Sequence, residues 1–289
     1  LGGAQGSADT AIKYANERVQ FGQAISNFGA IKYKIAEQAI RIFSGQSALY
    51  RVSHLLQKKR EELAAEGVPF AKAKLEGAEE YAIECSILKI VGSEVVDYVV
   101  DETLQIHGGM GFIEETGAAQ FYRDAKILTI YEGTTAIQAN DLIGRKTTRD
   151  GGKTVKAIAA NIETTEQELN ALASPAALLI AKNLSAARQA FLDVVDFMVA
   201  NYKSNPNAAF AGSVPYLMLT GNLIAGWQMA RSYLAASQEL AKGKDAAFMT
   251  AKMVTAQFYA QHILVRTSSL RDSIVAGGDV VSEMALDSF

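Results

Sequence analysis

The stretch "VVDYVVDETLQIHGGMGF", residues 95–112, decides between two fold classes. Taken alone, its β-branched start favours a strand, and a strand followed by glycines is how dinucleotide-binding folds begin. In the longer segment, however, apolar residues recur at every fourth position, which is the spacing of one helical face. They are Ile83, Ile87, Val91, Val95 and Val99. We therefore predict an amphipathic helix over residues 70–104, which excludes the dinucleotide-binding fingerprint.

Helical spacing continues on both sides of this stretch. Upstream it predicts helices over residues 11–18 and 30–65, separated by a loop or sharp turn in "FGQAISNFG", residues 21–29. Gly67 and Pro69 end the longer of these helices. Downstream it predicts short helices over residues 116–130 and 134–146, with "YEG", residues 131–133, as a tight turn between them. The predicted fold class is all-α.

A change of composition at "KTTRDGGK", residues 146–153, marks a domain boundary. We expect one domain over residues 1–147 and a second over residues 148–289. In the second domain, Ser174 and Pro175 begin a helix as its capping residue and first helical residue. Two further amphipathic helices follow, from Tyr216 to "KGKD" and from Phe248 to "AGGD". This pattern predicts an antiparallel helical bundle.

The composition argues against several functional classes. With 28 Lys and Arg against 31 Asp and Glu, the net charge is −3, and no basic block indicates a nucleic-acid partner. No apolar run approaches the roughly 20 residues of a transmembrane segment. The three His residues are too far apart for a metal site, and the chain lacks a GxSxG elbow and a Walker loop. Because the chain begins at Leu1 rather than Met, inside a helix-forming segment, we expect a piece of a longer protein.

Two features remain as candidates for chemistry, and the residue pattern leaves alternatives open for each. Gly108 and Gly109 either bring their amides close to the phosphates of a ligand or cap the helix before a turn. Glu132, between Tyr131 and Gly133, is either a general base in a mobile turn or a solvated loop carboxylate.

Three motifs, in order along the chain, resemble the C-terminal helical domain of the acyl-CoA dehydrogenases. They are "YANERVQFGQAI" from residue 14, "QIHGGMGF" from residue 105 and "RDAKILTIYEGTTAIQANDLIGRK" from residue 123. The resemblance covers residues 1–147 and implies that family's C-terminal four-helix bundle. The remainder resembles the branch with an extra C-terminal helical domain, as in 3-methylmercaptopropionyl-CoA dehydrogenases.

The resemblance implies a reaction on an acyl-CoA thioester. In this family a glutamate takes a proton from Cα while a hydride leaves Cβ for FAD, which gives a trans-2-enoyl-CoA. Glu132 matches that glutamate in the "YEGT" motif, and the amide of the same residue is one donor to the thioester oxygen. By the same match, Gly133 leaves room for the acyl chain and the base, and Tyr131 forms a wall of the substrate site.

The resemblance also implies FAD contacts across a subunit interface. Arg18 and Phe21 match "RxxFG", in which the arginine meets the FAD pyrophosphate of a neighbouring subunit. Gln105, Gly108 and Gly109 match "QxxGG", which carries the ADP part of that cofactor. A homodimer or homotetramer is therefore expected.

Further partners follow from the same family. Thr134 and Thr135 match residues that contact FAD within their own subunit. Electrons are expected to pass to an electron-transfer flavoprotein, in the bacterial cytoplasm or alternatively in the mitochondrial matrix. Gly29 and Ala136 depart from the family, which often has Gln at both places, and each departure removes a polar contact to the cofactor.

The family's N-terminal helical domain and middle β-domain have no counterpart in these residues. The isolated chain is therefore expected to be inactive. Two alternatives are a non-catalytic helical assembly or interaction module, and an acyl-CoA oxidase that reduces oxygen. We propose no site in residues 148–289. Other residues are interpreted as structural: Phe112 and Cys85 as core or half-buried residues, and Trp227, Arg231 and Tyr233 as packing residues of their own bundle.

Overall fold

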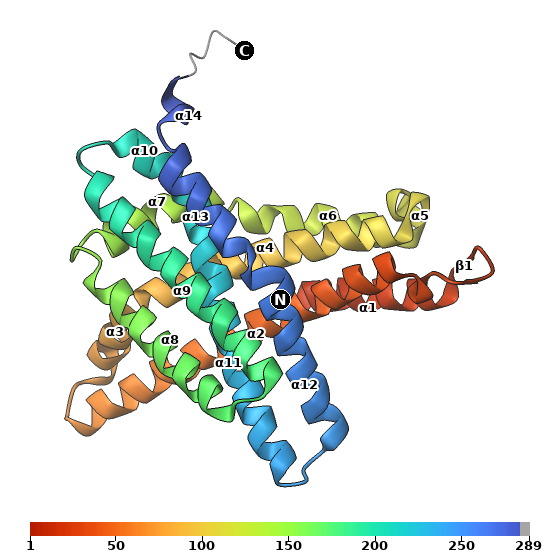
Figure 1. The fold of residues 1–289 in the computed structure, drawn as a ribbon. Helices are drawn as coiled ribbons and strands as arrows, with labels where there is room; N and C mark the ends of the chain where they lie inside the picture. Colours follow the sequence, from red (N-terminus) through yellow and green to blue (C-terminus); the bar gives the residue numbers. More distant parts are fainter. Residues whose placement is uncertain (284–289) are drawn as a thin grey trace. The chain divides into compact units, whose positions relative to one another are not determined.

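The computed structural model describes residues 1–283, except for the side chain of Ser282, and these residues are almost entirely helical (Figure 1). The prediction of an all-α fold is confirmed. Among the described residues, no helix combines the length and the apolar run required to cross a membrane. The residues form two compact units, each made of two stretches: residues 1–46 with 88–135, and residues 47–87 with 136–289.

The first unit is built around the segment that decides the fold class. Residues 95–100 are helical, within α4 (Ala82–His107), as the four-residue spacing predicts. Four valines of this segment are buried against small residues of α1 (Gly2–Glu17) and against Ile42 of α2 (Gly29–Ala65). Alanine at these positions lets the two helices approach closely. The cluster consists of Ala4, Ala8, Ile42, Val95, Val96, Val99, Val100 and Ala125.

Several buried polar groups in this unit are paired with each other. The hydroxyl of Ser7 in α1 donates to the Thr103 hydroxyl of α4 over 2.8 Å, and Thr103 in turn donates to the Val99 carbonyl. Gln38 of α2 donates to the same carbonyl over 3.1 Å. These bonds fix the register of three helices, because an unpaired buried polar group costs about 1–3 kcal/mol.

A short hairpin stands where a loop or sharp turn was predicted. Strands β1 (Val19–Gln20) and β2 (Gln23–Ala24) pair in antiparallel fashion, and η1 (Ile25–Asn27) follows them. The two residues at the tip, Phe21 and Gly22, both have positive φ, at 51° and 83°. Two-residue hairpin turns with this conformation match the twist of the flanking strands.

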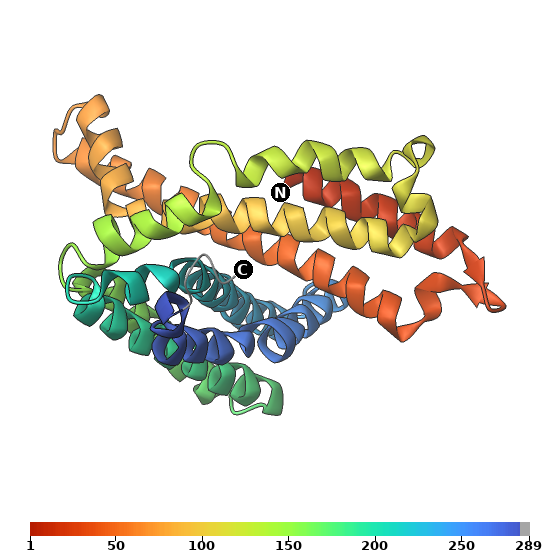
Figure 2. The same ribbon diagram turned by 90° about the horizontal axis from the view of Figure 1, so that it is seen from above.

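Short helices make up the rest of the first unit. After α4 come α5 (Gly109–Phe112), η2 (Glu114–Thr116), α6 (Ala118–Lys126) and η3 (Ile127–Thr129). Figure 2 shows α6 running alongside the later part of α4. The expectation that Phe112 belongs to the core is wrong, since 85% of its side chain is exposed. The buried edge of α5 is Gly111, so the next residue projects outward.

The segment 70–104 is interrupted, contrary to the prediction of a single helix. Helix α3 (Phe70–Glu80) ends at Tyr81, and α4 begins at Ala82. Gly77 of α3 lies against the backbone of α2, where an added Cβ would be 3.6 Å from the Leu56 carbonyl oxygen. The chain therefore turns back on α2 before continuing as α4. Cys85 is exposed rather than part of the core.

The second unit contains the predicted helical bundle. Helices α8 (Lys153–Leu172), α9 (Pro175–Asn201), α11 (Ser213–Ala241), α12 (Ala246–Phe258) and α13 (Arg266–Gly277) pack around buried side chains (Figure 1). Shorter elements precede, connect or follow these helices. They are α7 (Thr135–Asp141), η4 (Leu142–Thr147), α10 (Pro206–Ala211), η5 (Tyr259–Leu264) and α14 (Val280–Glu283).

Side-chain contacts fix the helix starts and pairings of this bundle. The predicted cap at Ser174 is confirmed, because its hydroxyl accepts from the Ala177 amide over 3.2 Å. The guanidinium of Arg188 in α9 donates twice to the Glu166 carboxylate of α8, over 2.7 and 3.0 Å.

Candidate functional site

The first cluster of candidate residues lies where α1 meets the hairpin. Arg18 is the residue after α1, and its amide still donates to the Tyr14 carbonyl over 2.8 Å. Its carbonyl accepts from the Ile25 amide, so the hairpin is closed at its base. The Arg18 side chain is exposed, while Phe21 at the hairpin tip is 93% exposed and contacts Phe28 edge to face. A phenylalanine held outward on a tight turn makes little contact within its own chain.

Two of the three glycines that follow α4 are required by the structure, each for a different reason. Gly108 has φ +60° and ψ −137°, a conformation open to glycine but strained for other residues. Its amide donates to the Leu104 carbonyl, so it also ends the helix. An added Cβ at Gly111 would be 2.6 Å from the Leu104 carbonyl oxygen, which makes this glycine necessary for packing.

Gly109 differs from both neighbours. Its φ is not positive, and an added Cβ would meet nothing within 4 Å. Neither backbone conformation nor packing within the described residues explains why this position is a glycine. An open backbone of this kind lets a ligand or another chain approach closely.

The structure brings Arg18 and the two glycines to one cavity of about 440 Å³. Tyr14 and His107 form part of its wall, where their rings stack with centroids 4.2 Å apart. The His107 Nδ1 atom lies 2.7 Å from the Thr103 carbonyl oxygen, which fixes the orientation of the imidazole. His107 is buried, so its role in this wall is structural. Gln105 is exposed on the last turn of α4 and does not line the cavity.

The second cluster is the turn between η3 and α7. Glu132 has φ +54° and Gly133 has φ +91°, so both residues lie in the left-handed region. The prediction that Glu132 sits in a turn is confirmed. A non-glycine residue in this conformation is uncommon, and such residues concentrate at functional sites. The Glu132 side chain is exposed, and Tyr131 beside it is 47% exposed.

Lys89 holds this turn from α4. Its ammonium donates to the carbonyl of Tyr131 over 3.1 Å and to that of Gly133 over 2.8 Å. The same ammonium lies 5.9 Å from the centroid of the Tyr131 ring. Both backbone carbonyls that flank Glu132 are therefore tied to one side chain. Sequence analysis missed Lys89, because a lysine 42 residues away on a helix face carries no local signal of this contact.

The threonines after Glu132 begin α7. The Thr135 hydroxyl donates to the Glu94 carboxylate of α4 over 2.7 Å, which ties the start of α7 to the same helix as the turn. Thr134 is exposed beside it. Residues 131–135 thus form a compact group fixed to α4 at Lys89 and Glu94.

The two clusters do not converge within one chain. The glycines precede α6 and the Glu132 turn follows η3, so the clusters lie at opposite ends of this helical segment (Figures 1 and 2). This segment runs from Ala118 to Thr129 and spans roughly 18 Å at a helical rise of about 1.5 Å per residue. No group of three or more metal-ligating side chains was found among the described residues.

Comparison with protein families matches both halves of the sequence. The model described as the C-terminal domain of acyl-CoA dehydrogenase matches residues 1–146. A second model, described as acetyl-CoA dehydrogenase C-terminal like, matches residues 153–285.

Individual relatives give the same assignment. The chain is 51% identical over 218 residues to a 3-methylmercaptopropionyl-CoA dehydrogenase from Ruegeria pomeroyi, over 75% of this chain and 37% of that protein. It is 38% identical over 137 residues to a probable acyl-CoA dehydrogenase from Bacillus subtilis, over 47% of this chain and 23% of that protein. A caffeyl-CoA reductase–Etf complex subunit from Acetobacterium woodii is 35% identical over 138 residues, 48% of this chain and 31% of that protein.

A solved structure extends the similarity to nearly the whole chain. The acyl-CoA dehydrogenase from Bacillus anthracis, crystallised in complex with FAD, superimposes with a TM-score of 0.76 at 27% identity. The alignment covers 99% of this chain and 48% of the other. The chain therefore spans less than half the length of this relative, and about a third of the Ruegeria protein.

Proposed function

The chain belongs to the acyl-CoA dehydrogenase family, and we propose that the whole protein converts an acyl-CoA thioester to a trans-2-enoyl-CoA. The observation that carries this proposal is the Glu132 turn. Its left-handed backbone and its attachment to Lys89 present one carboxylate from a fixed position. A general base must be held at a defined place beside the proton that it removes.

The residues of the first cluster fit the FAD that this family uses. The guanidinium of Arg18 offers forked donors to a diphosphate, and it lines a cavity together with Gly108 and Gly109. Gly109 leaves its backbone open, with nothing within 4 Å of an added Cβ, so a phosphate can approach the amides closely. Phe21 and Gln105 are exposed beside this cavity and are proposed to contact the same cofactor. FAD, when bound, supplies the acceptor for a hydride from the substrate Cβ.

The residues of the second cluster carry out the proton transfer. A carboxylate oxygen of Glu132 removes a proton from the substrate Cα, and the backbone N–H of the same residue donates to the thioester carbonyl oxygen. That hydrogen bond acidifies the Cα proton by stabilising the enolate-like charge. Tyr131 forms a wall of the acyl site, and Gly133 leaves room for the acyl chain. Thr134 and Thr135 are proposed to contact the cofactor of their own subunit.

The separation of the two clusters supports an oligomer. Arg18 and the glycines lie at the other end of α6 from Glu132, so we propose that they serve the cofactor of a neighbouring copy. We propose a homodimer or homotetramer on this basis. The name of the Acetobacterium woodii relative includes an Etf complex, which supports an electron-transfer flavoprotein as the electron acceptor.

Two further assignments are proposals on the same basis. The family-model matches at residues 1–146 and 153–285 support a division into sequence domains at residues 147 and 148. The bacterial origin of the 51% identical relative supports the bacterial cytoplasm over the mitochondrial matrix as the place of action.

The test requires the full-length protein, assayed against a panel of acyl-CoA substrates with an artificial electron acceptor. Glu132→Gln is expected to lower kcat by about a hundredfold or more, because general-base catalysis contributes roughly 10²–10⁴. The flavin absorbance should be unchanged. Glu115→Gln is the matched control, since this exposed carboxylate belongs to the same unit.

Three outcomes would contradict parts of the proposal. Full activity of Glu132→Gln would remove the assigned base. Peroxide formation in the absence of an added acceptor would indicate an acyl-CoA oxidase. A colourless full-length protein that forms stable oligomers and has no activity would favour a non-catalytic assembly module.

A further inference from the structure

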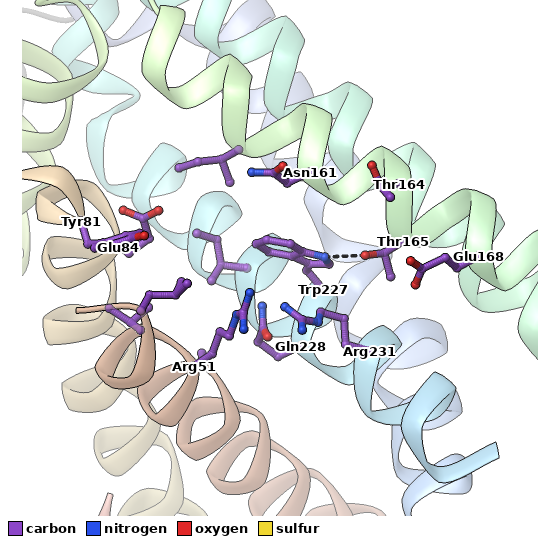
Figure 3. A pocket seen from close by; sticks show the side chains of 15 residues that line it. Arg51, Tyr81, Glu84, Asn161, Thr164, Thr165, Glu168, Trp227, Gln228 and Arg231 are labelled. Atoms are coloured by element: carbon purple, nitrogen blue, oxygen red, sulfur yellow. Dashed lines mark hydrogen bonds between the residues drawn. The ribbon is translucent and has the colours of Figure 1, made fainter. Parts of the chain in front are cut away.

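A cavity of about 370 Å³ lies within the second unit and shares no lining residue with the two clusters described above (Figure 3). It is lined by side chains of α2, of the α3–α4 junction, of α8 and of α11. Every lining residue belongs to residues 47–87 or 136–289, whereas Arg18, Gly108, Gly109 and Glu132 all belong to the other unit. This cavity is therefore a separate feature of the protein.

Two arginines meet at this cavity. Arg51 comes from α2 and Arg231 from α11, and Figure 3 shows both side chains extending beneath the indole of Trp227. The pKa of Arg231 is held below its usual value, first because the guanidinium is desolvated and second because the charge of Arg51 is nearby. Like charges at close range repel each other, so an anion between them would lower the energy of the pair.

One donor of this pair lacks an acceptor among the described residues. The Nε atom of Arg51 is buried and has no hydrogen-bond partner in the described part of the chain. Neither arginine forms an ion pair with a carboxylate within 4 Å among the described residues. A buried donor without a partner destabilises the protein, and a ligand that supplies an acceptor would remove that cost.

Two carboxylates, Glu84 and Glu168, also line the cavity. Glu168 lies near Arg231 and favours the charged form of its guanidinium, against the effects of burial and of Arg51. Burial raises the pKa of the Glu84 carboxyl above its usual value. In Figure 3 Glu84 lies with Tyr81 at one end of the cavity and Glu168 at the other, on either side of the arginines.

An aromatic surface adjoins the arginine pair. The Nε1 atom of Trp227 donates to the Thr165 hydroxyl over 2.8 Å, which fixes the orientation of the indole. The Arg231 guanidinium carbon lies 5.8 Å from the centroid of the Trp227 ring. An anion bound by the arginines would thus have an immobilised apolar ring beside it.

We propose that this cavity binds a phosphate group, with Arg51 and Arg231 as its donors and Trp227 in contact with the organic part of the same ligand. Phosphate is favoured over carboxylate because its two charges and several acceptor oxygens match two guanidinium forks on different helices. The cavity is larger than a phosphate group alone needs and falls in the range of small-molecule sites, about 300–1,000 Å³. The ligand class is therefore a small organic phosphate, with free phosphate as the other source of the same group.

Trp227 provides a direct test, because it is the single tryptophan of the 289-residue chain. Its fluorescence is titrated with phenyl phosphate, inorganic phosphate, benzoate and the uncharged benzyl alcohol. We expect a saturable change with phenyl phosphate that weakens as salt is added, and weaker binding of benzoate. Inorganic phosphate that binds as tightly as phenyl phosphate would identify free phosphate as the source. Equal responses to phenyl phosphate and benzyl alcohol would overturn the proposal, and so would tighter binding of benzoate.

Variants assign the binding to the arginine pair. Arg51→Gln and Arg231→Gln are each expected to weaken phenyl phosphate binding roughly ten- to a hundredfold, the loss of one charge-assisted hydrogen bond. Arg51→Lys keeps the positive charge but lacks the forked N–H donors of a guanidinium. Its affinity for phenyl phosphate should lie between those of the wild type and of Arg51→Gln. Arg149→Gln, an exposed arginine of the same unit that does not line this cavity, should bind like wild type. Unchanged affinity in both glutamine variants, with circular dichroism showing a native fold, would refute the assignment.

Discussion

The glycines of α5 allow the structure to be tested with two substitutions only two residues apart. Gly111→Ala would place a Cβ 2.6 Å from the carbonyl oxygen and 2.9 Å from the Cα of Leu104. Both are backbone atoms, so no side-chain rotation relieves the contact. Carbon–oxygen contacts normally lie near 3.3–3.6 Å, and the backbone must therefore shift by roughly 0.7 Å. Overpacking of this kind costs about 1–3 kcal/mol.

Gly109→Ala is the matched control for this change. Its added Cβ would meet nothing within 4 Å, and its φ is not positive. The free energy of unfolding should therefore change by no more than about 0.5 kcal/mol.

Both variants can be made in the chain described above and unfolded with urea. The transition should be followed by far-ultraviolet circular dichroism, because the single tryptophan lies in the other unit and would not report on α5. Gly111→Ala should lower the stability of the first unit while Gly109→Ala leaves it unchanged. Equal stability of the two variants, or a larger loss in Gly109→Ala, would refute the packing argument. In the full-length protein, Gly109→Ala should in contrast lower FAD content, since the proposed function places the cofactor against that backbone.

Further substitutions test other contacts. Tyr216→Phe leaves the buried Thr147 hydroxyl without its 2.8 Å partner and should cost about 1–2 kcal/mol in urea unfolding. Burial raises the pKa of Tyr216 above its usual value of 10.0, so its contribution is complete below about pH 10 and is lost as the pH rises further. Wild type should accordingly lose stability above pH 10 more steeply than Tyr216→Phe. Arg188→Met removes the partner of Glu166, which is 5% exposed, and should cost about 3 kcal/mol. Arg145→Met should cost less than 1 kcal/mol, because the Arg145 side chain is 83% exposed and its partner Asp141 keeps Lys146. Lys89→Met should speed amide hydrogen exchange at residues 131–133 roughly tenfold, measured by mass spectrometry, and unchanged exchange there would contradict its role in holding the turn.

Local periodicity explains why the helices could be predicted. The spacing of Ile83 to Val99 describes which side of one helix is apolar, and this information is complete within the segment. The cap at Ser174 and the turn at Glu132 are similarly local. The break at Tyr81 is different, because α3 folds back on α2 through contacts at Gly77 that no pattern within residues 70–104 encodes.

Long-range contacts set the limits of prediction at the candidate sites. Motifs place Arg18, Gly108 and Gly109 in one family pattern, and the structure adds that they line one cavity. Lys89 reaches the Glu132 turn from 42 residues away in sequence, and Arg51 approaches Arg231 from a different helix. Sequence alone favours Trp227 and Arg231 as packing residues, because two side chains four residues apart on one helix do not indicate a cavity. Such pairs become visible only when the helices are placed together.

The composition of the two compact units has a consequence for dissecting the protein by truncation. Residues 47–87 group with residues 136–289, although the family models divide the sequence after residue 146. A recombinant piece that starts at residue 148 would lack Arg51, Val52, Tyr81 and Glu84, one whole side of the cavity around Trp227. Transplanting the C-terminal helices onto another protein would therefore require the second half of α2, all of α3 and the beginning of α4 to travel with them.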